Sequence, residues 1–257
     1  MRKDHTQYSL GSVLGCALLA GVVAGLFVAA FHQLATEPVL QRAIDLEGAL
    51  KKASGEPVQP ELFSRSIQHV GLFIGYLLYG IGWGALFGVV ASLLPLLTRI
   101  PFSVKQGLGL LLVSCWTVGI FPQLKYPANP PGVGEAATIG FRQEIYLSIL
   151  LLSILGTLLA AIAYQVLGKA KKGWQRPRVR VSLVAGLYLL YIGTVYVCLP
   201  NYSDPVRLPS DLMVLFHWLS VIGVLLFWLA LGCLFVLFLG RPRLSKTSET
   251  PVINLET

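Results

Sequence analysis

Long uncharged apolar stretches dominate the pattern of this chain. A bilayer core about 30 Å thick is crossed by about 20 helical residues that each rise 1.5 Å. Six stretches approach or exceed that length, and they lack the strict alternation of a membrane β-barrel. Because lipid offers the backbone no hydrogen bonds, each stretch is predicted to be a helix. The predicted spans are residues 9–31, 70–97, 104–121, 145–167, 181–199 and 212–239.

Basic residues are divided unequally between the two sides of this all-α bundle. The two terminal segments and the connections on their side hold 13 of the 20 Lys and Arg residues, and the other connections hold 7. Cytoplasmic loops carry an excess of Lys and Arg, so both termini are predicted to be cytoplasmic and the protein to lie in the inner membrane. Residues 1–8 then form a cytoplasmic N-terminus, residues 9–240 one membrane domain, and residues 241–257 a disordered cytoplasmic tail.

Composition supports the membrane assignment and narrows the class of function. Hydrophobic residues make up 55% of the 257 residues and charged residues 12%, about half the share in soluble domains. The net charge of +8 is spread over several connections. It fits this topology and attraction to anionic lipid, so nucleic acid is not a predicted partner. The four cysteines lie in or beside the spans without CxxC spacing, which argues against a disulfide scaffold.

Two of the outer connections are unusual. Residues 32–69 alternate in charge and have helical periodicity around residues 39–46, which predicts a short amphipathic helix lying at the membrane surface. Residues 122–144 are rich in proline. We expect this second connection to be stiff and not helical.

Glycines recur at intervals of four residues in the first two spans. Gly80, Gly84 and Gly88 follow this spacing and continue a pattern from Gly71 and Gly75, while the first span contains two further G-x-x-x-G pairs. Residues four apart share a helix face, where glycine lets another backbone approach closely. The first two spans are therefore predicted to pack tightly against each other. A glycine-lined path or hinge is the alternative interpretation.

Three of the four histidines lie at the outer ends of spans. His32 follows the first span, His69 precedes the second, and His217 lies just inside the sixth, while Glu37 stands five residues after His32. Deprotonated imidazoles and carboxylates suit Co²⁺, Ni²⁺ or Zn²⁺. We predict that these four side chains form a metal site near the outer face. Each histidine is also consistent with a simple interfacial position, and their spacing matches no strong metal motif.

The outer connections also supply candidates for the entrance to such a site. Polar and aromatic side chains gather in and after the proline-rich connection: Tyr126, Asn129, Glu135, Arg142, Glu144 and Tyr146. A charged residue is missing from the centre of every span, although coupled transporters usually place one there. An ion path would have to use backbone carbonyls, a partner helix, or hydroxyls such as those of Ser114, Thr117 and Ser153.

Residues 122–134 (PQLKYPANPPGVG), Thr138, Ile139 and residues 142–146 resemble the CbtA family of cobalt transporter subunits. The end of the first span, with His32, Glu37 and Pro38, resembles the same family, and the resemblance extends over roughly residues 10–240. It implies a polytopic inner-membrane protein assigned to cobalt uptake. It also implies a small single-span partner, CbtB, that carries histidines.

The predicted function is therefore membrane uptake of a divalent metal ion, with Co²⁺ ahead of Ni²⁺ and Zn²⁺ and no tightly bound cofactor. An inside-negative potential favours inward movement of a divalent cation by roughly 4.6 kcal/mol per 100 mV. A P-loop and a nucleophile–base pair are both missing, so an enzyme is not predicted. Two alternatives remain: a non-transporting assembly protein that binds pigment, lipid or other subunits, and a haem protein with two histidine ligands.

Overall fold

The computed structural model describes residues 8–55, 63–98, 102–130, 133–134, 136–170, 176–201 and 208–240. Within these ranges it is all-helical, and six helical segments are long and apolar enough to cross a membrane. This confirms the predicted all-α fold with six helices of membrane-spanning length. The predicted tail at residues 241–257 lies outside the described residues.

The described chain forms eight α-helices, two π-helices and one 3₁₀ turn. In order these are α1 (Leu10–Phe31), the π-helix η1 (His32–Thr36), α2 (Glu37–Ser54), α3 (Arg65–Thr98), α4 (Val104–Ser114), the π-helix η2 (Cys115–Ile120), α5 (Phe121–Lys125), the 3₁₀ turn η3 (Ala136–Thr138), α6 (Ile139–Gly168), α7 (Pro177–Cys198) and α8 (Ser210–Leu239). Polar caps set two of the starts. Ser9 accepts a hydrogen bond from the Ser12 amide before α1, and Ser103 and Gln106 form a capping box before α4.

Helix continues further than predicted into the proline-rich connection. The expectation that residues 122–144 are not helical is wrong at both ends, because α5 includes Pro122 and α6 begins at Ile139. Pro122 stands in the first turn of α5, directly after η2. Proline is tolerated here because α5 continues the wider π-helical turn, and the Thr117 carbonyl oxygen, five residues before Pro122, accepts a hydrogen bond from the Ser153 hydroxyl instead of from a backbone N–H.

The predicted amphipathic helix is present as α2, but it continues from the first span instead of forming a separate element. α1, η1 and α2 together make one helical segment of 45 residues, Leu10–Ser54. Val39 and Ala43 of α2 are buried in a cluster with Leu212 and Phe216 of α8. α2 ends at Ser54, and Gly55 after it has a left-handed backbone (φ 71°).

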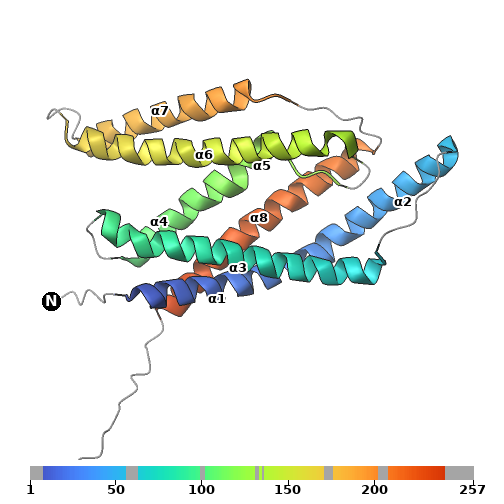
Figure 1. Ribbon diagram of the computed structural model, residues 1–257, viewed down its shortest axis with the longest axis horizontal. Helices are drawn as coiled ribbons and strands as arrows, with labels where there is room; N and C mark the ends of the chain where they lie inside the picture. Colours follow the sequence, from blue (N-terminus) through green and yellow to red (C-terminus); the bar gives the residue numbers. More distant parts are fainter. Residues whose placement is uncertain are drawn as a thin grey trace, which may run out of the picture.

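The helices form a tightly packed group and an outlying hairpin. Figure 1 shows α1 and α3 side by side, α6 and α7 paired on the far side, and α4 and α8 between these layers. The main core lies between α1, α3 and α8, and includes Ala20, Phe87 and Trp228. The α6–α7 hairpin joins the rest mainly through η2 and α5.

Close backbone approach joins α1 to α3. A Cβ atom added to Gly80 would lie 2.2 Å from the carbonyl oxygen of Gly21, and one added to Gly84 would lie 2.7 Å from that of Ala17. A Cβ on Gly88 would lie 2.9 Å from the Cβ of Ala17. Glycine is therefore required for these two helices to lie at this distance.

Candidate functional site

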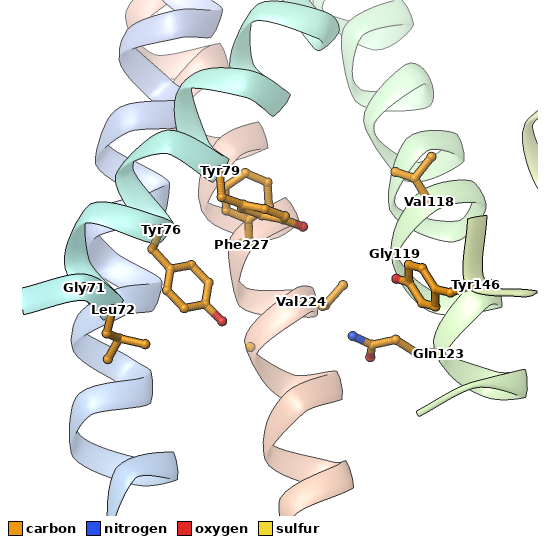
Figure 2. A pocket seen from close by; sticks show the side chains of 12 residues that line it. Gly71, Leu72, Tyr76, Tyr79, Val118, Gly119, Gln123, Tyr146, Val224 and Phe227 are labelled. Atoms are coloured by element: carbon orange, nitrogen blue, oxygen red, sulfur yellow. The ribbon is translucent and has the colours of Figure 1, made fainter. Parts of the chain in front are cut away.

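A cavity of about 380 Å³ lies between α3, η2, α5, α6 and α8; we call it the membrane chamber. Figure 2 shows the phenol groups of Tyr76 and Tyr79 on α3 directed into it, with Tyr146 and Gln123 on the opposite side. The Gln123 Oε1 atom is buried without a hydrogen-bond partner. The chamber is therefore a partly open, largely apolar space between helices, into which three tyrosines and a glutamine bring polar atoms.

Glycines create the space of the membrane chamber. Gly71 and Gly75 line it from α3, and a Cβ atom at either position would have no atom within 4 Å. Gly223 lines it from α8 but is packed on its other side, since a Cβ there would lie 2.2 Å from Nε2 of His32. The missing side chain of Gly223 thus brings the His32 imidazole up to the wall of the chamber.

One π-helix lines this chamber, and the other contacts two of its lining residues through His32. In η1, the His32 ring stacks on Tyr76, with centroids 5.0 Å apart, and its Nδ1 lies 2.8 Å from the Thr36 hydroxyl. On the other side, η2 contributes Val118 and Gly119 to the lining. Wider π-helical turns occur frequently at functional sites. One such helix in the lining and a second in contact with it single this cavity out as the candidate site.

Two of the hydroxyls considered for an ion path instead connect η2 to α6. The Ser153 hydroxyl donates to the Thr117 carbonyl oxygen at 2.7 Å, and the Thr117 and Thr157 hydroxyls lie 2.8 Å apart. Ser153 is fully buried. These contacts satisfy polar groups in the irregular helix and hold one wall of the chamber in place.

A charged cluster lies where α2 and α3 begin. Oε1 of Glu37 accepts hydrogen bonds from Nη2 of Arg65 and from Nε2 of His69, the latter at 3.0 Å. His69 and Tyr76 are seven residues apart, which places them on the same face of α3. The cluster therefore lies at the end of the helix face that leads to the membrane chamber.

The predicted four-residue metal set is only partly brought together. Glu37 and His69 are in contact, whereas His32 stands at the chamber wall beside Gly223. His217 precedes Gly223 by six residues, about 9 Å along α8, and its Nε2 is buried without a partner. Across the described part of the chain, no three His, Cys, Asp or Glu side chains form a group that could hold a metal ion.

The predicted entrance residues surround a second cavity of about 500 Å³ beneath the proline-rich connection. Tyr126, Asn129, Arg142 and Tyr146 line it. The Tyr126 hydroxyl donates to the Pro200 carbonyl oxygen, and the Arg142 guanidinium occupies the space beside Gly134, whose φ is +99°. Tyr146 and Gln123 line both this cavity and the membrane chamber, so the two cavities adjoin at these residues.

The two remaining entrance candidates are not placed at either cavity. The Glu144 side chain is exposed, and its carbonyl oxygen accepts a hydrogen bond from Ser148. Glu135 lies outside the described residues.

Sequence reasoning missed Tyr76, Tyr79 and Gln123. Two tyrosines three residues apart inside an apolar span lie on one side of the helix, and that spacing was an available signal for an internal polar surface. Gln123 follows Pro122 in a segment expected to be a loop, so nothing local indicated that its amide enters the bundle.

These features define a polytopic α-helical membrane protein with a partly open chamber between its helices. The model of the family described as "Probable cobalt transporter subunit (CbtA)" matches residues 10–240, and the chain belongs to this family. The family is one of transporter subunits, which implies that its members work with partner subunits, and it is not a known enzyme family. No curated protein and no solved structure matches the chain.

Proposed function

We propose that this protein moves a divalent transition-metal ion, Co²⁺ ahead of Ni²⁺ and Zn²⁺, into the cytoplasm through the membrane chamber. The observation that carries the proposal is this chamber, which tyrosines and a glutamine line beside the π-helix η2, in a chain that belongs to a family of probable cobalt transporter subunits. An apolar bundle needs no such space for its own stability. The chamber does suit a cation that must exchange part of its water shell.

The oxygen donors of the chamber favour passage over tight retention. Its described lining offers phenol and amide oxygens and no Asp or Glu side chain. Neutral oxygen atoms can replace water around an ion without holding it as strongly as a carboxylate does. Conduction requires an ion to be bound well enough to enter and weakly enough to leave.

The predicted ligands are proposed to act in sequence along this route. Glu37 and His69 would capture the ion about 15 Å along α3 from Tyr79, at ten residues of 1.5 Å each. His32 would then meet it at the chamber wall beside Gly223. His217, whose Nε2 has no partner, is the fourth candidate ligand.

The proposed orientation rests on the distribution of Lys and Arg, and the proposed driving force is the membrane potential. With both termini in the cytoplasm, α3 begins at the outer face of the inner membrane and the capture pair faces the incoming ion. The membrane potential would favour entry of a divalent ion by roughly 4.6 kcal/mol per 100 mV. A small single-span subunit that carries histidines, like CbtB, is the proposed partner.

The proposal is tested by filling the chamber. Gly75→Leu places an isobutyl group in open space, so the protein should fold while radiolabelled Co²⁺ uptake into cells falls to near the level of cells without the protein. Gly82→Leu is the matched control, because Gly82 lies on the same helix, has no atom within 4 Å of an added Cβ, and does not line the chamber.

Unchanged uptake by Gly75→Leu at equal protein abundance would contradict this route. If uptake stayed unchanged while a complex with another subunit was lost, a non-transporting assembly role would be favoured. A Soret band in the purified protein would indicate haem instead.

A further inference from the structure

We infer that Arg65 is a built-in competitor for the metal ion: its guanidinium occupies the Glu37 carboxylate until a divalent cation displaces it. The inference rests on the proposed function and names how the capture pair is regulated. It concerns a site with two protein ligands, Glu37 and His69, whose other ligands would be water.

The spacing of the two ligands fits one metal ion. Oε1 of Glu37 and Nε2 of His69 lie 3.0 Å apart. Neighbouring ligands of an octahedral ion, each about 2.1 Å from the metal, are about 3.0 Å apart. A cation could therefore bridge these atoms with little movement of either helix once His69 has lost its Nε2 proton.

Arg65 stands in the way of that ion. Its Nη2 donates to Oε1 of Glu37, the same atom that contacts His69. The side chains of Arg65 and Glu37 are 25% and 18% exposed, so water and ions can reach the pair. An incoming ion must replace one positive charge on this carboxylate with another.

The structure also provides a second acceptor for the displaced guanidinium. Nη1 of Arg65 donates to Oε1 of Gln68 at 2.5 Å, and Nε2 of Gln68 donates in turn to the Phe63 carbonyl oxygen at 2.9 Å. Arg65 can therefore leave Glu37 without losing all of its hydrogen bonds.

The exchange has a consequence for release. Leaving the partly buried Glu37 carboxylate without a cation costs free energy. Without Arg65, that cost would hold the ion at the entrance. Return of Arg65 to Glu37 removes that cost when the ion moves inward. The competitor thus lowers affinity at the capture pair and favours onward transfer.

The test measures Co²⁺ binding to the full-length protein in detergent by equilibrium dialysis. Arg65→Gln is expected to bind Co²⁺ about tenfold more tightly than wild type, because the ion no longer has to displace a charge-assisted hydrogen bond. Arg65→Lys keeps the charge and should stay near wild type. The matched control is Lys51→Gln, which also frees a glutamate from a basic partner, Glu47, and should leave binding unchanged.

Two further variants identify the site. Glu37→Gln combined with Arg65→Gln should lose the gain in affinity. Gln68→Ala removes the second acceptor and should weaken Co²⁺ binding, because the displaced guanidinium has no place to go. This second variant leaves the Arg65–Glu37 contact intact and keeps the test open if Arg65→Gln unfolds.

An Arg65→Gln affinity equal to or weaker than that of wild type would overturn the inference, and so would unchanged binding by Gln68→Ala. If Gly75→Leu still abolished uptake in that case, the proposed route would stand without the competitor. Absence of Co²⁺ binding in every variant would also overturn the inference. Absence of uptake by wild type as well would overturn the proposed function with it.

Discussion

The two glycine pairs of α3 have the same spacing and opposite surroundings. Gly80 and Gly84 lie against the backbone of α1, where an added Cβ would come within 2.2 to 2.7 Å of a carbonyl oxygen. Gly71 and Gly75 border the membrane chamber, where an added Cβ meets nothing within 4 Å. Packing against α1 therefore accounts for one pair, whereas the other pair lines a cavity, as the proposed path requires.

The difference comes from a break in the four-residue interval. The step from Gly75 to Gly80 is five residues, and Gly71 and Gly80 are nine residues apart, which places them half a turn from each other around α3. The expected continuous stripe of small residues is therefore wrong. α1 lies against α3 (Figure 1) and covers the side with Gly80 and Gly84. The side with Gly71 and Gly75 borders the membrane chamber.

The largest effect is expected from Gly80→Ala. The new methyl group would collide with the Gly21 carbonyl oxygen, and backbone cannot rotate away as a side chain can, so we expect a loss of about 3 kcal/mol of folding free energy. Unfolding in detergent followed by tryptophan fluorescence measures it. Gly75→Ala is the matched control and should unfold as wild type does. Equal stability of the two variants would contradict the different surroundings of the two glycine pairs.

A smaller effect is expected from Gly223→Ala, where the collision is with a side chain. The His32 ring would have to turn, losing its contact with Thr36 and its stacking on Tyr76, which together cost about 2 kcal/mol. Co²⁺ uptake should fall as well, because His32 leaves the chamber wall. A variant that is destabilised yet transports normally would show that His32 serves packing alone.

The smallest effect is expected from Tyr76→Phe, which tests the side of α3 that borders the membrane chamber. The ring would still stack on His32, so stability should not change. Loss of one hydroxyl from the chamber should slow Co²⁺ uptake by about two- to tenfold, the equivalent of one hydrogen bond. Tyr164→Phe, at the other end of α6 beside Arg180, is the control and should not slow it. If Tyr76→Phe took up Co²⁺ at the wild-type rate, the Tyr76 hydroxyl would not contribute to the route.

Sequence reasoning was more accurate for the spans than for the site. Six apolar runs predicted six helical spans, although α3 and α6 begin five and six residues earlier than their apolar runs, because polar first turns are helical too. The site required contacts between Glu37 and His69, 32 residues apart, and between His32 and Tyr76. Such contacts depend on how helices cross, which a periodic pattern does not encode.

By itself, the sequence determined that this is a multi-pass membrane protein, that it has six helices long and apolar enough to cross a membrane, and that the chain belongs to the CbtA family. Those properties are local, since each helix satisfies its own backbone and each apolar run selects its own solvent. Only the tertiary structure decided which glycines pack and which stay open, and which candidate ligands meet. Both depend on the rotation and crossing of helices that are distant in the chain, and packing between side chains sets these over the whole bundle.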